Sequence, residues 1–491
     1  MVKAHFDSIA QRQPQAIAVV DGATRLSYEE LRLRSGQLAR CLVEEAGVRR
    51  GDTVAICLPN CWEWIAAFVA TMGIGAVLVP VHSQWRGPEL TWIAGRLGFR
   101  ALITDSELAT AWSEAGATPP ALILVNDPAL QAHMCAAEEP MPASPVGAGE
   151  RATIFATSGS TGRPRLVPIT NANLMGWVKC GAAGLGMQPG SRSLGTVPYH
   201  YSGAFMNGML VPLLTGATTV VLKAFTPAAA EAAIAQERVE IMFGPPFLFS
   251  MMLENNVRRE SLASLRTAVS GGAPMAPETV RQLEDKLGLR VQQGYGASEA
   301  GIIAIQPREI PFQPGLVGRP QVTIDLHVED ESGKRLAAGE IGEVVVGGPS
   351  VFAGYLDEPE LNQRSFRNGF FRTGDLGRLD ESGNLFICGR LKHVLNLGGV
   401  KVDPVEIEHA VMELPAVRDC MVHGVQDELQ GELAAATIAL RPGHKLTRQQ
   451  VVTHCRQRLA EFKIPRQIEF VKNIAVDATG KRPQAWDKHD E

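Results

Sequence analysis

The sequence predicts an α/β protein, with a large N-terminal α/β body over residues 1–390 and a small C-terminal α+β domain over residues 391–491. Three observations predict this organisation. Strand-like and helix-like segments alternate along most of the chain. Two segments that end in glycine turns flank one helix, as in a β-α-β unit. New helix-capping signals near the C-terminus then indicate a second, smaller core.

The composition is that of a globular protein without a strong charge bias. Of 491 residues, 45% are hydrophobic and 20% are charged, and the formal net charge is -5. This balance provides no basic surface for nucleic acid and no polybasic run for an anionic membrane. Residues 1–15 contain no apolar core typical of signal peptides, and no apolar run is long enough to span a bilayer. We therefore expect a cytoplasmic protein without nucleic-acid partners or integral membrane association.

The N-terminal region begins the alternation. Residues 28–43 have helical periodicity with Ser27 at the N-cap position, and residues 53–59 (TVAICLP) are typical of a buried strand.

The chain has eight cysteines, of which Cys57 and Cys61 are the closest pair. Their spacing excludes a CxxC redox motif, and no nearby histidine supports a zinc site. We expect buried free thiols.

A β-α-β unit follows in the middle of the chain. Residues 265–274 (LRTAVSGGAP) predict a strand that ends in a glycine turn, and residues 289–301 (LRVQQGYGASEAG) predict another. The helix between them has Pro277 near its first position and Gly288 as its stop. Both glycine turns lie at the carboxyl ends of strands, where open α/β sheets bind ligands.

The C-terminal unit begins near GRLKHVLNLGG. One helix starts with Asp403 as N-cap, Pro404 at its first position and Glu406 completing a capping box, and a second uses Thr447 and Gln450 in the same way. Each helix is followed by a strand-like run, CMVHGV and QIEFV. These elements predict a small α+β core.

The stretch TSGSTGRPRL, residues 157–166, gathers hydroxyls and glycines between the strand-like runs ATIFA and RLVPIT. Glycines let backbone N–H groups turn toward an anion, so such a loop suits a polyphosphate. It is not a Walker loop, because Gly159 and Gly162 are too close and no Gly-Lys-Ser/Thr follows. On hydroxyl and glycine content alone, a polar surface loop is the favoured interpretation.

Partial matches to three other motifs, the Walker loop, the dinucleotide fingerprint and the hydrolase nucleophile elbow, each lack a required residue. Gly296 and Gly301 have Walker spacing, but Ile302 stands where the lysine is required. Glu299 occupies the third glycine position of a dinucleotide fingerprint. GASEA resembles a hydrolase nucleophile elbow around Ser298, but the final glycine is an alanine.

The ordered set of motifs is more specific than any one of them. TSGSTGRPRLV, VPYHYSG, GYGASEA, FFRTGDLG, GRLKHVLNLGGVKVDPVEIE and ATGK occur in this order. Together they resemble the core motifs of the acyl-adenylate-forming (ANL) superfamily, and the chain is most similar to its acyl-CoA synthetases. The resemblance covers nearly the whole chain. It implies layered sheets, a mobile C-terminal domain, and activation of a carboxylic acid with ATP and Mg2+, followed by thioester formation with CoA or the phosphopantetheine of a carrier protein.

The resemblance also assigns nucleotide-binding residues. Asp375 is expected to accept the ribose hydroxyls, Tyr295 to pack on the adenine, and Arg390 to add positive charge near the α-phosphate. Arg165 replaces the usual lysine after the loop, which keeps the charge but changes its geometry. The remaining expected nucleotide contacts are Thr157, Ser158, Gly159, Ser160, Thr161 and Gly162 at the β- and γ-phosphates, Gly271, Gly272 and Ala273 at the adenine edge, and Gly296 and Ser298 in the second turn.

Catalytic roles follow from the same resemblance. Lys481 is expected to bind the reacting carboxylate and the α-phosphate, and Glu299 is expected to bind Mg2+. His200 is expected to be a catalytic residue next to the reacting acid. Lys392 matches the hinge about which the C-terminal domain rotates between the two half-reactions. Gly398 and Gly399 then offer a path for a pantetheine arm, and a plain hairpin turn is the alternative reading of this pair.

The acyl pocket is expected between the VPYHYSGAFMNGM segment and the second glycine turn. Its expected lining is His200, Tyr201, Phe205, Met206 and Phe247 on one side, with Gly294, Gly296 and Ile302 opposite. Several of these side chains are equally typical of plain core. No Asp or Glu occurs between Gly190 and Glu231 to pair with an ammonium. We therefore expect an aliphatic or aromatic acid without an α-amine.

The expected acceptor is the thiol of CoA. LGGVK superficially resembles a carrier's phosphopantetheine site, but Lys401 stands at the position of the required serine. A discrete carrier protein remains the alternative acceptor. A nucleotide-binding homologue without catalysis is a more distant alternative, given the change at Arg165.

Overall fold

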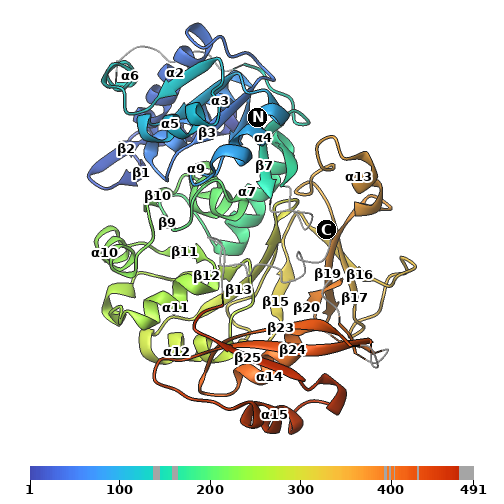
Figure 1. Cartoon of the computed structure of the whole chain (residues 1–491). Coiled ribbons are helices and arrows are strands. Elements are labelled where there is room, and N and C mark those ends of the chain that lie inside the picture. The colour runs from blue at the N-terminus through green and yellow to red at the C-terminus, as the bar shows by residue number, and fades with distance from the viewer. Residues whose placement is uncertain are drawn as a thin grey trace.

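The computed structural model describes residues 1–135, 144–157, 164–391, 395–397, 400–402, 404–427 and 431–474. Within them, two large sheets with helices around them make the N-terminal body, and a third sheet belongs to the C-terminal unit. Figure 1 shows this unit at the bottom, beneath the large body. The predicted α/β fold with layered sheets and a small C-terminal domain is confirmed.

The first sheet has the strand order β6-β5-β3-β4-β7-β8. All its pairs are parallel except β7 with β8, which are antiparallel neighbours joined by the hydroxyl-rich loop. Its strands are β3 (Thr53–Cys57), β4 (Val77–Pro80), β5 (Ala101–Thr104), β6 (Ala121–Leu124), β7 (Arg151–Thr157) and β8 (Arg165–Thr170).

The second sheet runs β16-β17-β19-β20-β15-β14-β13-β12-β11-β9-β10-β1-β2, with β18 beside β19. It is parallel from β13 to β1 and antiparallel elsewhere. Its strands are β1 (Ile17–Asp21), β2 (Thr24–Ser27), β9 (Arg192–Gly195), β10 (Thr218–Val221), β11 (Ile241–Gly244), β12 (Thr267–Gly271), β13 (Val291–Ala297), β14 (Gly301–Ile305), β15 (Leu316–Pro320), β16 (Asp325–Glu329), β17 (Gly342–Gly347), β18 (Phe366–Arg367), β19 (Phe370–Leu379) and β20 (Leu385–Arg390).

Side-chain alternation along the strands produces the layers. Val54 and Ile56 of β3 enter the core between the two sheets, whereas Ala55 and Cys57 face an outer core. The central layer contains α1 (Val2–Arg12), α2 (Tyr28–Glu44), α3 (Trp62–Ile74), α6 (Pro128–Met134), α7 (Asn171–Leu185), the π-helix η1 (Phe205–Leu210) and α9 (Val211–Thr215). The short helix α8 (Ser202–Ala204) precedes η1, and its Ala204 packs in the outer core of the second sheet. The outer helices are α4 (Gly87–Leu97) and α5 (Ser106–Glu114) on the first sheet, and α10 (Pro227–Glu237), α11 (Pro246–Glu254), η2 (Arg259–Leu262) and α12 (Pro277–Leu287) on the second; α13 (Pro359–Ser365) precedes β18.

The C-terminal unit has its own apolar core. Its sheet has the order β22-β21-β24-β23, with β25 paired to β24. Its elements are β21 (Leu395–Leu397), β22 (Val400–Val402), α14 (Pro404–Met412), β23 (Val417–Asp427), β24 (Gly431–Leu440), α15 (Arg448–Arg456), η4 (Glu461–Lys463) and β25 (Gln467–Val471). The division at residues 390 and 391 stays a prediction.

The local capping predictions are largely confirmed. Ser27 caps α2 in a capping box with Glu30, and Thr447 with Gln450 does the same for α15. The helix α12 ends at Gly288, which adopts the left-handed conformation at φ 63°. Asp403 lies outside the described residues.

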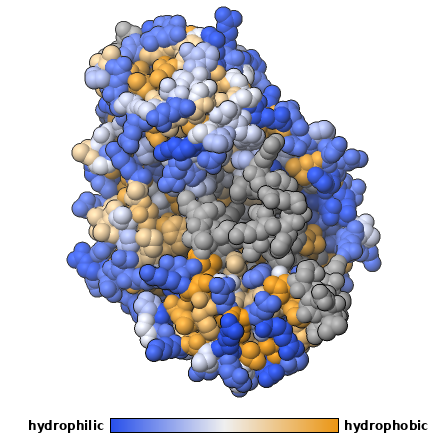
Figure 2. All heavy atoms as spheres, viewed as in Figure 1, coloured by the Kyte–Doolittle hydropathy of each residue, from blue (hydrophilic) through white to orange (hydrophobic). Residues whose placement is uncertain are grey.

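All eight cysteines are free thiols. Six are buried and Cys388 is half-buried, but Cys135 is exposed, so the expectation of buried thiols is wrong for Cys135. Hydrophilic residues outline most of the face shown in Figure 2. Within the described chain, no helix combines the length and apolarity that crossing a membrane requires.

Candidate active site

The second glycine turn lies at the centre of the site. It joins β13 to β14, and Gly294 pairs with Gly271 of the neighbouring strand β12. A Cβ on Gly296 would lie 2.4 Å from the carbonyl oxygen of Gly301, so no side chain fits there. Gly272 has φ 89° and open space above it. The two turns therefore form a surface of glycine backbone at the carboxyl ends of two parallel strands.

Tyr295, Asp375 and Arg390 form one hydrogen-bonded group beside this surface. Tyr295 donates its hydroxyl to Asp375 Oδ2 at 2.5 Å, and Arg390 Nε donates to Oδ1 at 2.7 Å. Asp375 raises the pKa of Arg390, and burial, followed by Asp375, raises the pKa of Tyr295. Tyr295 therefore stays a neutral donor. Each carboxylate oxygen of Asp375 has a second lone pair, which can still accept a ligand hydroxyl.

Glu299 lies at the end of the same turn, half-buried. Its Oε1 accepts a hydrogen bond from the Tyr355 hydroxyl at 2.8 Å, and its backbone oxygen accepts one from the Phe352 N–H at 2.7 Å. Its charge also contributes to the raised pKa of Arg390. Among the described residues, Oε2 of Glu299 has no hydrogen-bond partner, so it is the oxygen available to a ligand.

His200 is 8% exposed, and its Nε2 has no hydrogen-bond partner among the described residues. Its ring centroid lies 4.0 Å from that of His82, which follows β4 in the first sheet. His82 Nδ1 accepts from the Gln84 N–H, so in neutral His82 the proton is on Nε2, which donates to the Tyr201 hydroxyl at 3.1 Å. Burial, followed by His82, holds the pKa of His200 well below its usual value. His200 is therefore neutral at pH 7.

This burial predicts a pH dependence of stability. Because the folded-state pKa lies below the unfolded value, the unfolded chain binds more protons as pH falls below about 6.5. Wild type should then lose stability relative to His200→Gln, by up to about 1.4 kcal/mol per pH unit. Urea unfolding of both proteins between pH 7.5 and 5.5 measures the difference. Parallel stability curves would contradict a buried neutral His200.

Ser202 joins the expected acyl segment to the central turn, since its Oγ lies 2.7 Å from Ser298 Oγ. The Phe243 ring lies next to both the first glycine turn and the acyl segment. A Cβ on Gly271 would lie 3.0 Å from this ring, and a Cβ on Gly203 would lie 3.7 Å from it. The structure therefore brings the 200–203 segment, Phe243 and both glycine turns together.

The other expected pocket residues differ in their surroundings. Phe205 is fully buried and contacts the rings of Trp64, Phe68 and Phe155, and Met206 belongs to the same core. Tyr201 and Phe247 are half-buried, and Ile302 is buried in β14. The structure shows Phe205 and Met206 as core residues, and their assignment to the acyl pocket stays a prediction.

Thr157 and Arg165 stand on facing positions at the ends of β7 and β8. Thr157 Oγ1 donates to the Arg165 carbonyl at 3.4 Å. Strands flank the loop as predicted, and the structure shows in addition that they form an antiparallel pair. The other expected residues of the loop, Ser158, Gly159, Ser160, Thr161 and Gly162, lie outside the described residues, as do Lys392, Gly398, Gly399 and Lys481.

Sequence reasoning missed His82, Phe243 and Tyr355. His82 follows the apolar strand β4, and Phe243 lies near the carboxyl end of the apolar strand β11. Such a position is a weak signal for a site residue. Tyr355 lies in no element between β17 and α13, and no motif considered from the sequence included it.

Comparison with known proteins agrees with this geometry. Residues 6–356 match the family model described as AMP-binding enzyme, and residues 406–481 match the AMP-binding enzyme C-terminal domain. This chain belongs to the AMP-binding enzyme family. Relatives of this AMP-binding enzyme include a feruloyl-CoA synthase from Amycolatopsis sp, 33% identical over 96% of this chain and 95% of that protein. A medium-chain fatty-acid–CoA ligase of Escherichia coli is 28% identical over 97% of this chain and 88% of that protein.

Solved structures of the family share the fold. ATP-bound MatB from Rhodopseudomonas palustris superposes with a TM-score of 0.90 at 28% identity, covering 98% of this chain and 97% of that one. The o-succinylbenzoate CoA synthetase MenE of Bacillus subtilis, in complex with AMP, gives 0.86 at 26% identity, covering 97% and 96%. The chain is an AMP-forming acid–thiol ligase of the acyl-CoA synthetase type, which uses ATP and CoA.

The residues present fit a nucleotide and a divalent cation. The glycine surface leaves space that a side chain would fill, and Asp375 offers free lone pairs beside it. Oε2 of Glu299 is a hard oxygen ligand of the kind that Mg2+ prefers. In the described part of the chain no three His, Cys, Asp or Glu side chains gather to hold a metal by themselves. A cation at Glu299 would therefore take its further ligands from other oxygens, such as those of water and phosphate.

Proposed function

We propose that this AMP-binding enzyme converts an aliphatic or aromatic carboxylic acid without an α-amine into its CoA thioester. In the first half-reaction a carboxylate oxygen attacks the α-phosphorus of ATP, and the bond to pyrophosphate breaks. In the second, the CoA thiol loses its proton and attacks the acyl carbonyl, and AMP leaves. The observation that carries the proposal is the group of Tyr295, Asp375 and Arg390 beside the glycine turns.

Each side chain of this group has a role toward the nucleotide. Asp375 accepts the ribose hydroxyls, and Arg390 holds the carboxylate in place while it adds positive charge toward the α-phosphate. Tyr295, neutral and bonded to Asp375, offers its ring to the adenine. Glu299 would hold Mg2+, and the ion when bound would supply positive charge at the phosphate oxygens. Thr157 and the following loop residues donate to the β- and γ-phosphates.

His200 and Lys481 act on the reacting carboxylate. Neutral His200 offers Nε2, buried and unpartnered among the described residues, as a donor to a carboxylate oxygen. Lys481 stabilises the charge that develops as pyrophosphate leaves. Rotation about Lys392 then replaces Lys481 by the loop of Gly398 and Gly399 for thioester formation.

The substrate class follows from the charges around the acyl segment. Residues 191–230 contain no carboxylate, and the His200 ring lies against the His82 ring, with 4.0 Å between their centroids. A buried ammonium would remain unpaired, which is costly. The Phe243 ring lies next to Gly271 and Gly203 and adds an apolar side chain to this region. This composition favours an acid without an ammonium group near its carboxylate.

The experiment is an acid panel with ATP and Mg2+. Aromatic, aliphatic and α-amino acids are each offered with CoA or with a phosphopantetheinyl carrier protein, and AMP and thioester are measured together. We expect acid-dependent AMP release, CoA thioester formation and no response to α-amino acids. Thioester on the carrier alone would assign the other acceptor. Acid-independent or absent AMP release would contradict catalysis.

A further inference from the structure

Tyr355 connects Glu299 to the strand that follows the hydroxyl-rich loop. Its hydroxyl donates to Glu299 Oε1 at 2.8 Å, and the guanidinium of Arg165 lies 5.6 Å from its ring centroid. Tyr355 is 5% exposed, and burial, followed by Glu299, raises its pKa, so the hydroxyl keeps its proton. One side chain therefore contacts both the carboxylate assigned to the metal and the cation next to the phosphate loop.

The surroundings of Tyr355 fix its position. Asn362 accepts from the Tyr355 N–H at 2.7 Å and donates to its carbonyl at 2.8 Å. The Phe352 ring packs against the Tyr355 ring at 4.9 Å between centroids, in an edge-on arrangement of 73°. The neighbouring Leu356 N–H donates to the carbonyl of Leu166 in β8 at 3.0 Å. The ring thus has little freedom to turn away from Glu299.

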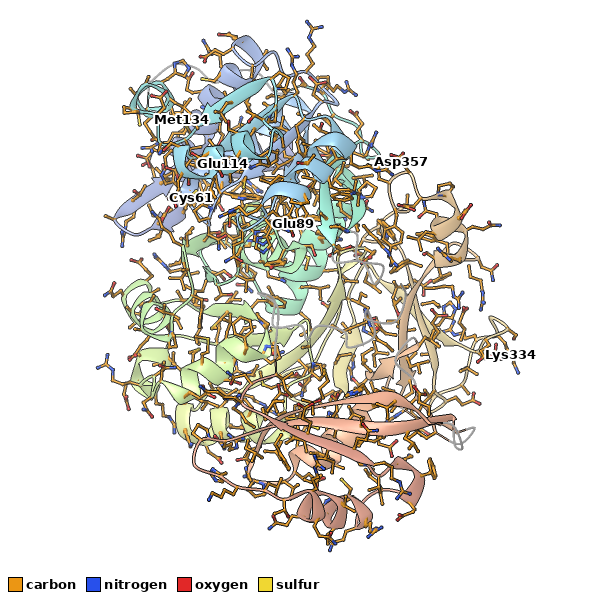
Figure 3. All side chains as sticks on the ribbon, in the orientation of Figure 1. Cys61, Glu89, Glu114, Met134, Lys334 and Asp357 are labelled. Carbon is orange, nitrogen blue, oxygen red and sulfur yellow. The ribbon has the colours of Figure 1, made fainter. Side chains whose placement is uncertain are left out.

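The same segment makes a second contact, with helix α4 on the outer face of the first sheet. Asp357, labelled in Figure 3, lies 3.6 Å from Arg96 of α4 between their closest charged atoms. Asp357 has φ 55°, an uncommon conformation for a residue other than glycine. Contacts on both sides therefore hold the chain around Tyr355 between the sheet that carries the loop and the turn that carries Glu299.

We propose that Tyr355 is a positioning residue, which holds Oε1 of Glu299 so that Oε2 faces Mg2+, and that Arg165 fixes the tyrosine ring. The inference rests on the proposed function, since it takes Glu299 as the metal ligand. A planar guanidinium can lie over an aromatic ring, whereas a lysine ammonium is a point charge. The replacement of the family's usual lysine by Arg165 thereby has a physical reason.

The test is metal binding by Tyr355→Phe. Mn2+ replaces Mg2+ and is titrated by electron paramagnetic resonance with ATP present and the acid omitted, so that no turnover occurs. Loss of one hydrogen bond to a charged group should weaken Mn2+ binding about tenfold. Binding of AMP, measured by calorimetry without metal, should be unchanged. Unchanged Mn2+ binding would overturn the inference.

Three further variants separate the possible outcomes. Tyr28→Phe is the matched control, because it removes a fully buried tyrosine hydroxyl that donates to the Ala217 carbonyl, and Mn2+ binding should stay at the wild-type value. Arg165→Lys should weaken Mn2+ binding by roughly threefold, with no additional loss when combined with Tyr355→Phe. Independent, fully additive losses would contradict the role given to Arg165.

Glu299→Gln distinguishes failure of this inference from failure of the proposed function. If Glu299→Gln weakens Mn2+ binding and Tyr355→Phe does not, the positioning role is wrong and the metal role of Glu299 stands. If neither variant weakens it, the metal role of Glu299 is wrong as well.

Discussion

Lys481→Ala is expected to slow acyl-adenylate formation by about a hundredfold to a thousandfold, the effect of losing one preorganised charge-stabilising donor. The lysine would act only while pyrophosphate leaves. Transfer of a supplied acyl-adenylate to CoA should therefore keep its wild-type rate. Acid-dependent pyrophosphate exchange measures the first half-reaction, and thiolysis of synthetic acyl-adenylate measures the second.

Lys445→Ala is the matched control, because Lys445 is an exposed lysine of the same C-terminal unit. Both half-reactions should be unchanged in that variant. If Lys481→Ala left both half-reactions intact, or slowed them equally, the assignment of Lys481 to adenylate formation would be wrong.

Asp375→Asn should weaken nucleotide binding about a hundredfold or more, since two ribose hydroxyls lose a charged acceptor and each such hydrogen bond contributes about 1.5–3 kcal/mol. The variant also removes the charge that Arg390 faces at 2.7 Å. Calorimetric titration with AMP measures the affinity in the absence of catalysis. The same loss should appear for ATP.

The stability of Asp375→Asn should fall less than its affinity. Arg390 is 53% exposed in its side chain, so water can solvate the guanidinium once its partner is neutral. Asp325→Asn, an exposed change in the same sheet, should leave both quantities unchanged. Wild-type AMP affinity in Asp375→Asn would show that the ribose binds elsewhere.

The parts of the fold with strong local signals could be predicted from the sequence. The unit β12, α12 and β13 follows from an apolar run, a proline at the start of a helix and Gly288 at its end, and all three signals act within a few residues. The capping boxes at Ser27 and Thr447 likewise depend on residues three positions apart. Signals of this kind depend only on neighbouring residues, so the sequence displays them directly.

The fold around the acyl segment could not be predicted in this way. Residues 205–210 form a π-helix whose side chains are buried between the two sheets. Phe205 is as apolar as any pocket residue, and only long-range packing against Trp64 and Phe68 gives it its place in the core. An apolar side chain in sequence does not reveal which surface it will meet.

In the candidate site, too, some residues could be predicted from the sequence and others could not. Asp375, Tyr295 and Glu299 stand in motifs that the sequence displays, and the structure places Asp375 against Tyr295 across 80 residues of sequence. His82 and Tyr355 reach the site from distant segments, so only the folded chain shows that they touch His200 and Glu299. Partners of this kind are set by tertiary contact.

The most direct measurement is a crystal structure with a non-hydrolysable acyl-adenylate analogue. We expect the adenine between the Gly271–Ala273 turn and the Tyr295 ring, the ribose hydroxyls on Asp375, and the acyl group toward His200 and Phe243. An analogue bound away from Asp375 and Tyr295 would contradict this assignment of the site.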